Sequence, residues 1–366
     1  MSKKSDILRP KAETAYAKEL KKLGELDDKP RPAGWKLSPS AVVDYLLGTE
    51  LSDGTTIQTK YFGDRRLIEL AVASLVTDRA LLLIGVPGTA KTWVSEHLAA
   101  AVSGDSSLLV QGTAGMGEES LRYSWNYARL LSEGPSEAAL VPSPVMLAMQ
   151  SGSLARIEEL TRMPSDVQDA LITILSEKIL PIPELNEQVA AKRGFNIIAT
   201  ANDRDKGVNE LSSALRRRFN TVRLPLPATL EEEVRIVVDR SGEAAERMGL
   251  PNFEKNPADE LGKLVTIFRE LRSGQTEDGR TQLKKPSSTL STAEAISVVN
   301  QGRALAAHFG ADQKGLTVAD LADSLRGAIV KDAQQDEPIW REYLDLVMRN
   351  RKGWSDWYEL LRDAEK

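Results

Sequence analysis

The 366-residue sequence contains no cysteine, which excludes both a disulfide framework and a thiolate zinc site. Its only two histidines, His97 and His308, argue against a metal centre built from imidazole ligands. No apolar run approaches the about 20 residues that a membrane-spanning helix needs, and the first residues lack the apolar segment of a signal peptide. We therefore expect a cytoplasmic protein without a membrane partner.

The overall charge is weakly acidic, with a net charge of −5 at pH 7 and an isoelectric point near 5.5. This balance gives no global attraction to nucleic acid, although it leaves room for a local basic patch. With 41% hydrophobic and 28% charged residues, the composition is that of an ordinary globular protein, and the length is sufficient for two domains.

The most informative segment is a glycine-containing stretch between an apolar run (80–84) and an amphipathic run (93–102). Its residues are Gly85, Val86, Pro87, Gly88, Thr89, Ala90, Lys91 and Thr92. A strand, a glycine turn and a helix in this order are typical of a phosphate-binding loop, in which backbone N–H groups and the helix N-terminus surround an anion. Lys91 is expected to reach the β- and γ-phosphates of a nucleoside triphosphate, and Thr92 to offer a hydroxyl ligand to Mg²⁺.

Ala90 occupies the position where such loops usually carry their second glycine. Because a methyl group is compatible with the loop only at negative φ, we expect a negative φ at Ala90. The competing interpretation of the whole segment is a chance glycine turn between a strand and a helix.

Two adjacent carboxylates, Glu158 and Glu159, end a strand-like run (154–157) downstream of the loop. In nucleotide hydrolases, one carboxylate at this place holds hydrated Mg²⁺ and a second orients the attacking water. By their order, Glu158 is expected to serve the metal and Glu159 the water, although the first position is normally aspartate. Arg156 makes the run less apolar than a buried strand should be, and the alternative is an ordinary acidic helix start before Leu160.

Two more polar elements follow in the chain. Asn202 follows the apolar run 197–201, which predicts an amide at the carboxyl edge of a sheet, in reach of the γ-phosphate and the attacking water. By itself an asparagine there is usually a turn residue.

Three arginines, Arg216–Arg218, precede Phe219 and require partners. Those partners are either phosphates bound by a neighbouring subunit or solvent around an exposed face.

The chain falls into three zones. Residues 1–40 form an N-terminal extension with a helical stripe that either docks a partner or packs on its own domain. Residues 41–227 alternate strand-like and helical patterns, which predicts an α/β core with a parallel sheet and flanking helices. Residues 228–366 are almost wholly helical, and we expect the aromatic residues near the C-terminus, Trp354, Trp357 and Tyr358, to seal a small helical core. The alternative for these aromatic residues is a recognition surface.

Together these ordered elements resemble the AAA+ ATPases, a class of P-loop NTPases, and within them the MoxR family. The apolar run 141–152 and the helix pattern 159–172 are similar to the family's segments around its acidic pair, with Thr161 in place of the usual Asn. Segments 179–182 and 188–191 look like the hairpin of this clade, and 112–131 looks like its extra helical insertion. The resemblance covers residues 57–227 well and implies a helical lid domain after the core.

The resemblance also implies a role for each matching residue. Residues 85–92 would form the Walker A loop, Glu158 and Glu159 the Walker B pair, Asn202 the sensor-1 residue and Arg218 the arginine finger. Phe62 and Gly63 occupy the family's adenine-binding position, where simple core packing is an equal alternative. No arginine occupies the sensor-2 position at the start of the lid helix; Ser291 and Glu294 there predict a helix capping box.

The function implied by this resemblance is that of a Mg²⁺-dependent, ATP-hydrolysing ring, commonly a hexamer, that remodels a protein partner in a chaperone-like manner. Proteins with a von Willebrand factor A domain are the partners that the MoxR family implies. Two alternatives stay open: a nucleotide-binding scaffold with little turnover, and an AAA+ ATPase that acts on nucleic acid. The acidic balance and the absence of a recognisable DNA-binding module argue against the last.

Overall fold

The computed structural model describes residues 7–203, 209–251, 258–310 and 316–363. The chain divides into two compact units: the first runs to Pro225 without Pro87–Thr89, and the second consists of Pro87–Thr89 and the chain from Leu226 onward. Within the described ranges, no helix combines the length and the apolar character that crossing a membrane requires.

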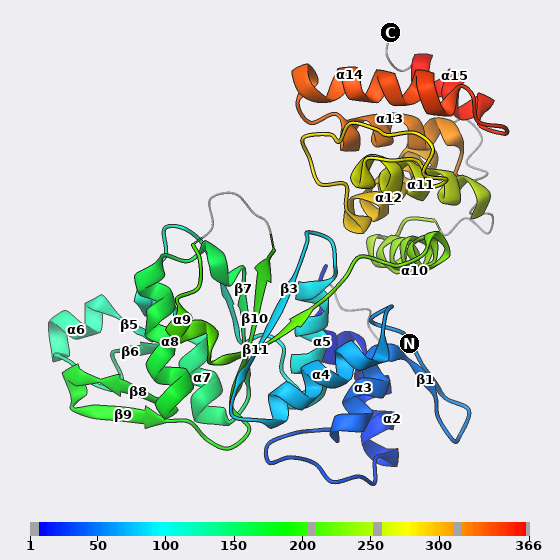
Figure 1. Cartoon of the computed structure of the whole chain (residues 1–366). Coiled ribbons are helices and arrows are strands. Elements are labelled where there is room, and N and C mark those ends of the chain that lie inside the picture. The colour runs from blue at the N-terminus through cyan, green and yellow to red at the C-terminus, as the bar shows by residue number, and fades with distance from the viewer. Residues whose placement is uncertain (1–6, 204–208, 252–257, 311–315, 364–366) are drawn as a thin grey trace. The chain divides into compact units, whose positions relative to one another are not determined.

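The first unit is built on a five-stranded sheet with the strand order β11-β3-β10-β7-β4 (Figure 1). All neighbouring strands in it are parallel, so helices connect them across the faces. The strands are β3 (Ala80–Gly85), β4 (Leu109–Gln111), β7 (Leu154–Glu158), β10 (Asn196–Asn202) and β11 (Phe219–Arg223). The prediction of an α/β fold with a parallel sheet is confirmed.

Both faces of the sheet are buried, as strand β3 illustrates. Leu81 and Leu83 point into one hydrophobic core, whereas Ala80 and Leu82 belong to the core on the opposite face. Side chains alternate between the two faces along a strand, and both faces of a parallel sheet are covered. This is why the run 80–84 is apolar without interruption.

Helices cover the two faces. Those that contribute to the first core are α3 (Pro39–Leu47), α4 (Arg65–Val76) and α5 (Lys91–Ser103). Those that contribute to the second are α7 (Pro144–Ser151), α8 (Ser165–Glu177) and the short α9 (Ser213–Arg216). Local sequence sets their ends: α7 begins with the Ser143 hydroxyl accepting from the Met146 N–H at 3.0 Å and ends at Gly152 in the left-handed region.

The N-terminal segment is part of the first unit. It forms α1 (Ala12–Ala15) and α2 (Ala17–Leu26), and the stripe expected on it is turned inward. Ala12 and Leu23 are 3% and 4% exposed, and Tyr16 and Leu20 pack against the same core. The stripe therefore packs on its own unit, which was one of the two predicted outcomes.

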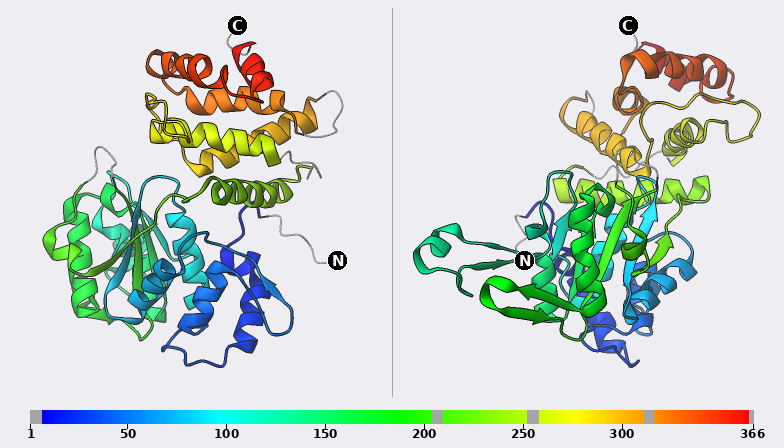
Figure 2. Two further views of the ribbon diagram at one scale, coloured as in Figure 1. Left: turned by 45° about the vertical axis from the view of Figure 1, so that its right-hand side comes forward. Right: turned by 60° about the vertical axis from the view of Figure 1, so that its left-hand side comes forward.

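Three two-stranded antiparallel sheets and a short helix complete this unit. They are β1 (Thr49–Glu50) with β2 (Thr56–Ile57), β5 (Tyr123–Trp125) with β6 (Leu140–Pro142), β8 (Ile179–Ile182) with β9 (Glu187–Ala190), and α6 (Tyr127–Glu133). The hairpin expected at 179–191 is confirmed. The insertion expected at 112–131 holds a 3-10 turn (Glu118–Ser120) and strand β5, and its α-helix begins only at Tyr127. Figure 2 shows the β5–β6 and β8–β9 hairpins projecting at the same end of the unit.

The second unit is helical, as predicted for the region after the sheet. Its elements are α10 (Leu230–Met248), α11 (Ala258–Ser273), α12 (Thr292–His308), α13 (Val318–Ile329), α14 (Ala333–Tyr343), a π-helical turn (Leu344–Met348) and α15 (Ser355–Asp363). Trp354 and Trp357 lie in its hydrophobic core, and Tyr358 packs against it. The C-terminal aromatic residues therefore seal this core, as expected.

Two polar arrangements fix the helices of the second unit. The capping box predicted at α12 is present, since the Ser291 hydroxyl accepts from the Glu294 N–H and the Glu294 carboxylate accepts from the Ser291 N–H. The fully buried carboxylate of Glu233 on α10 accepts from Arg269 and Arg272 of α11 and from Thr292 of α12. One carboxylate thus joins three helices.

Candidate nucleotide site

The loop that follows β3 has the backbone path expected of a phosphate-binding loop. Gly85 ends β3; Val86, Pro87, Gly88 and Thr89 form the turn; and α5 begins at Lys91 with Ala90 as its N-cap. Gly88 has a φ of +84°, which only glycine adopts without strain. The turn leads directly into the N-terminus of a helix of 13 residues, where free N–H groups and the helix dipole favour an anion.

Ala90 contradicts the expectation drawn from its methyl group. Its φ is +62° and its ψ is +22°, the left-handed region, so the prediction of a negative φ is wrong. The loop must reverse direction immediately before the helix, and this sets the backbone of residue 90 whichever side chain it carries. Ala90 is exposed, so its methyl group meets solvent and the remaining penalty is the local strain of about 1–2 kcal/mol.

Lys91 is buried at the inner side of this loop. Its Nζ donates to the carbonyl oxygens of Gly85 at 2.9 Å and Val86 at 3.0 Å. Carbonyl oxygens are weaker partners for an ammonium group than phosphate oxygens, which bear a full charge. The arrangement therefore keeps the ammonium beside the loop, where a phosphate can replace the carbonyl contacts.

Thr92 and Glu158, the two residues predicted to hold Mg²⁺, are in contact at the edge of the sheet. Thr92 Oγ1 on α5 lies 2.8 Å from Glu158 Oε2 at the end of β7. An octahedral Mg²⁺ with bonds of about 2.0–2.1 Å has neighbouring ligand oxygens about 2.9 Å apart. A hydroxyl and a carboxylate oxygen at this spacing fit two neighbouring positions of a magnesium ion.

Glu159 and Asn202 form a second contact at the same edge. The Asn202 amide donates from Nδ2 to Glu159 Oε2 at 3.1 Å and to Oε1 at 3.3 Å. Asn202 ends β10, where it pairs in register with Gly85, the last residue of β3. The pair thus lies beside the start of the phosphate-binding loop.

The backbone aims the two glutamates in different directions. Glu158 is the last residue of β7 and its side chain is 3% exposed, whereas the Glu159 side chain is 27% exposed. Glu159 has a φ of +56°, and its N–H donates to Thr200 Oγ1 at 3.1 Å. A non-glycine residue held in this region is strained, and such strain is concentrated at functional sites. Because of this turn, the Glu158 carboxylate is buried, whereas the Glu159 carboxylate points toward solvent and Asn202.

Phe62 and Gly63, the residues predicted to hold adenine, follow a segment that is fixed beside α5. The indole Nε1 of Trp93 donates to the carbonyl of Lys60 at 2.9 Å, and the Tyr61 N–H donates to Leu46 O at 2.8 Å. Phe62 is half-buried and Gly63 is exposed. The segment therefore lies next to the first turn of the helix that begins at the loop, and base binding by Phe62 and Gly63 stays a prediction.

Arg218 lies at the opposite end of the sheet from the loop. Its carbonyl accepts from the N–H of Ala80, the first residue of β3, at 3.0 Å. The loop follows the last residue of this six-residue strand, and at about 3.3 Å per residue the two ends are about 17–20 Å apart. The Arg218 guanidinium bonds to Ser176 of α8 and to Ala214 O. Arg218 is therefore too far to reach a nucleotide in the loop of its own chain.

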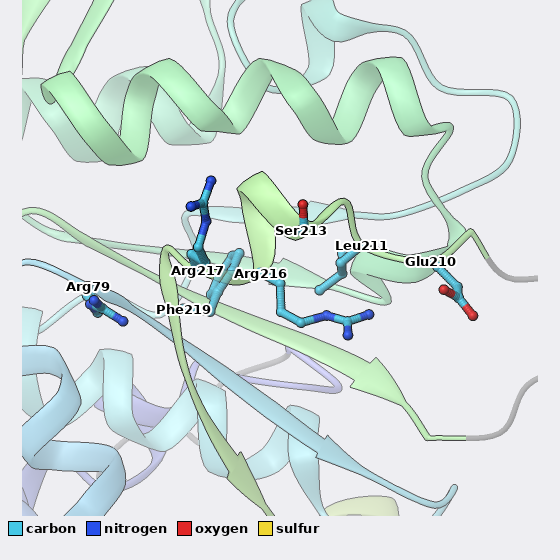
Figure 3. Close-up of a pocket in the computed structure, with 7 residues that line it drawn as sticks. All are labelled: Arg79, Glu210, Leu211, Ser213, Arg216, Arg217 and Phe219. Carbon is cyan, nitrogen blue, oxygen red and sulfur yellow. The ribbon is translucent and has the colours of Figure 1, made fainter.

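The other two arginines of the run are exposed and line an open hollow of about 640 Å³. Its lining residues are Arg79, Glu210, Leu211, Ser213, Arg216, Arg217 and Phe219. Figure 3 shows the guanidinium groups of Arg216 and Arg217 pointing away from each other, with Arg79 apart from both. The hollow is a charged face rather than a cradle in which all three cations converge on one small anion.

Several further residues, which no sequence motif indicated, shape the site. Ser95 and Thr200 both donate to the Glu158 carboxylate, the latter at 2.7 Å. Gly112 donates to Glu158 O at 2.7 Å, and a Cβ there would lie 2.3 Å from Glu159 O. Thr200 is two residues before Asn202 in a strand, so the alternation of β10 could have identified it. Ser95 and Gly112 carry no local signal.

Comparison with known proteins assigns the two units separately. The model of the AAA domain (dynein-related subfamily) matches residues 80–219, which hold the loop, the acidic pair, Asn202 and the arginine run. The model of the YehL-like AAA+ ATPase C-terminal domain matches residues 231–365, which form most of the helical unit.

Several proteins resemble this chain in sequence, some along nearly its whole length and others over only part of it. The uncharacterized protein YehL of Escherichia coli (strain K12) is 39% identical over 358 residues, which cover 96% of each chain. An uncharacterized protein of Staphylococcus haemolyticus (strain JCSC1435) is 27% identical over 170 residues, which cover 46% of this chain and 64% of the relative.

Among solved structures, NtrX from Brucella abortus in complex with ADP aligns with a TM-score of 0.49 and 16% identity, over 83% of this chain and 60% of NtrX. NtrX in complex with ATP aligns with a TM-score of 0.47 and 16% identity, over 84% of this chain and 70% of NtrX. The similarity to YehL extends along nearly the whole of both chains, and both domain models match in sequence order. The chain therefore belongs to the YehL-like AAA+ ATPases, with a AAA domain of the dynein-related subfamily.

Proposed function

We propose that the chain is a MoxR-like AAA+ ATPase that binds ATP together with Mg²⁺ and hydrolyses it. The observation that carries this proposal is the Glu159–Asn202 pair, 3.1 Å apart at the sheet edge next to Gly85. A phosphate-binding loop by itself is shared by many activities, whereas a partly exposed carboxylate held beside it has the chemistry of a general base for water.

In this proposal the loop binds the triphosphate. The N–H groups at the start of α5 and the Lys91 ammonium bind the phosphate oxygens, and Thr92 and Glu158 hold Mg²⁺. When bound, Mg²⁺ would neutralise charge that develops on the phosphates during transfer. Phe62 and Gly63 would contact the base, beside the first turn of α5.

Hydrolysis then requires an activated water. The Glu159 carboxylate accepts a proton from the water that attacks the γ-phosphorus, while the bond from this phosphorus to the β–γ bridging oxygen breaks and ADP leaves with that oxygen. The Asn202 amide holds the carboxylate in one orientation. In this proposal the Asn202 amide also contacts the γ-phosphate, which its pairing with Gly85 at the end of β3 supports. These assignments keep the roles that the sequence predicted for both residues.

We further propose a ring, with a hexamer as the expected form. The separation of Arg218 from the loop of its own chain, about 17–20 Å along β3, supports a role toward the nucleotide of a neighbouring subunit. Its present bonds to Ser176 and Ala214 would have to exchange for phosphate contacts on assembly. The resemblance to MoxR proteins adds a protein partner to be remodelled, with a von Willebrand factor A domain as the first candidate.

A steady-state phosphate-release assay with ATP and Mg²⁺, combined with light scattering to determine particle mass, tests this proposal. We expect turnover by the wild type, a loss of turnover with retained nucleotide in Glu159→Gln, and an increase in mass on addition of ATP and Mg²⁺. A wild-type protein that binds ATP but releases no phosphate would contradict hydrolysis. That result would favour the second candidate, a nucleotide-binding scaffold. The strained backbone of Ala90 and the lack of an arginine at the sensor-2 position support this candidate.

A further inference from the structure

Arg156 is a buried cation in the strand that carries the acidic pair. It lies on β7 two residues before Glu158, so both side chains point to the same face of the sheet. The two side chains are 4% and 3% exposed, and Arg156 Nη2 lies 2.9 Å from Glu158 Oε1. A charged pair this deeply buried is costly unless all its donors and acceptors are satisfied.

Every nitrogen of the Arg156 guanidinium has a partner. Nε donates to Ser95 Oγ at 3.1 Å, Nη1 to Ser106 O at 3.0 Å, and Nη2 to Thr92 O at 3.2 Å as well as to Glu158. Ser95 and Thr92 belong to α5, and Ser106 belongs to the segment before β4, so these three partners hold the guanidinium against both elements. The guanidinium is thus fixed to the helix that begins at the phosphate-binding loop.

Both oxygens of the Glu158 carboxylate are held in turn. Oε1 accepts from Arg156 and Ser95, and Oε2 accepts from Thr92 at 2.8 Å and Thr200 at 2.7 Å. Oε2 is the oxygen nearer to the Thr92 hydroxyl, so Arg156 binds the oxygen that the metal does not need. The guanidinium therefore sets which edge of the carboxylate faces the metal position.

The charge of Arg156 has a second consequence. A carboxylate and a guanidinium in contact carry no net charge together, and the interior screens their charges far less than water does. A bare divalent cation gains little from such a neutral pair, whereas a cation that arrives with a triphosphate brings its own anionic ligands. Arg156 therefore disfavours metal binding before the nucleotide is present.

We infer that Arg156 is a positioning residue: it holds Glu158 by one oxygen and offsets its charge, so that Mg²⁺ binds at Thr92 and Glu158 only together with the nucleotide. The inference rests on the proposed metal site, but its principal test needs no hydrolysis. No contact between Arg156 and a phosphate or a reacting atom is required for this role.

The test measures Mn²⁺, as a paramagnetic substitute for Mg²⁺, on nucleotide-free protein by electron paramagnetic resonance. Arg156→Met should bind Mn²⁺ about tenfold or more tightly than the wild type, because the carboxylate loses its counter-charge. Arg156→Lys keeps the charge, so its Mn²⁺ affinity should stay within about threefold of the wild type. Arg122→Met, which removes the same charge from a more exposed pair with Glu118, is the matched control and should behave like the wild type.

The orientation part of the role has its own measurement. Arg156→Lys loses the fork that fixes Glu158, and its turnover at saturating Mg²⁺ and ATP should fall about tenfold or more. Affinity for ATP in the presence of a chelator should change by less than about threefold in all variants, since Arg156 holds the carboxylate and not the phosphates. Circular dichroism establishes that each variant is folded.

The Mn²⁺ affinities and the turnover rates test the two parts of the role of Arg156 separately. Equal Mn²⁺ affinity in the wild type and a folded Arg156→Met would overturn the charge argument, and wild-type turnover in Arg156→Lys would overturn the orientation argument. If Arg156→Met does not fold, Arg156→Gln, which keeps hydrogen-bond donors without the charge, replaces it with the same expected result. A wild-type protein without ATPase activity would contradict the proposed function and leave the Mn²⁺ comparison intact.

Discussion

The Asn202 amide faces the Glu159 carboxylate, with Nδ2 3.1 Å from Oε2 and 3.3 Å from Oε1. The two residues are 43 positions apart in the sequence and come from the ends of neighbouring parallel strands. An amide that donates to both oxygens holds the carboxylate plane, and Arg162 Nε lies 3.5 Å from the same Oε2 as an ion-pair partner. This relationship connects the two residues to one step of the proposed reaction.

Glu159→Gln should lower turnover by about 10²–10⁴, the usual contribution of a general base, and should retain bound ATP. Asn202→Ala should lower turnover by a smaller factor, about tenfold to 10², because the base is present but less well oriented. The double variant should be no slower than Glu159→Gln alone, since both residues serve one step. Single-turnover kinetics and binding of a fluorescent ATP analogue measure these effects.

Asn126→Ala is the control for the previous prediction. Asn126 caps the exposed helix α6, and its hydrogen bonds join it to Arg129, Leu130 and Ala139. It should leave turnover unchanged. Equal turnover in Asn202→Ala and Asn126→Ala would remove Asn202 from the mechanism.

Arg218→Ala should lower turnover by about 10³–10⁵ if the residue acts on a neighbouring subunit, with nucleotide affinity within a few-fold. Lys91→Ala should abolish nucleotide binding, because the ammonium of the loop is lost. Mixing the two inactive variants should restore part of the activity, since an intact loop of one subunit meets an intact arginine of another. Phosphate release over a series of mixing ratios measures the recovery, and activity that stays at zero at all ratios would contradict action between subunits.

Ala90→Gly should stabilise the protein by about 1 kcal/mol, because glycine adopts a φ of +62° without the strain that alanine bears. The substitution leaves the loop path unchanged, so nucleotide affinity should not fall. Thermal unfolding of the nucleotide-free protein gives the shift in Tm. The exposed helical residue Ala128 supplies the opposite control, since Ala128→Gly should destabilise by about 0.5–1 kcal/mol. A loss of stability in Ala90→Gly would show that the left-handed conformation is not a source of strain.

The second unit should lose stability in acid through Glu233. Burial by itself raises the pKa of this carboxyl, but the hydrogen bond and charge of Arg272, with the Thr292 and Arg269 hydrogen bonds, outweigh it and lower the pKa below its ordinary value of 4.5. A lowered folded-state pKa means that this contribution to stability is complete above the unfolded value and is lost as the pH falls through the folded value. Denaturant unfolding followed by tryptophan fluorescence should therefore give a constant contribution above a pH of about 4.5 and a declining one below it.

Glu233→Gln identifies the group responsible. The variant leaves Arg269 and Arg272 without their buried partner and should lose about 3–5 kcal/mol of unfolding free energy at neutral pH. Its stability should also depend less on pH in the acid range than that of the wild type. Glu246→Gln, at an exposed position of the same helix, is the control. The same acid dependence in both variants would mean that Glu233 is not the source.

The sequence by itself determined the elements whose causes are local. The run 80–84 with its glycine turn gave a strand, a loop and a helix at the expected places, because backbone freedom, helix capping and side-chain alternation act over a few residues. The capping box at Ser291 and Glu294 was predictable for the same reason. The order of the polar residues along the chain indicated the AAA+ class, and the domain matches confirm this class.

Only the tertiary structure decided how those elements meet. In the sequence, Arg156 interrupts an otherwise apolar strand. In the fold, its guanidinium donates to Ser95 Oγ, Ser106 O and Thr92 O, which makes its burial possible. Ala90 takes a positive φ because the turn between β3 and α5 imposes it, against the preference of its own side chain. The distance between Arg218 and the loop follows from the register of β11 against β3. Burial, strand register and loop closure depend on residues far apart in the chain, so a local pattern cannot encode them.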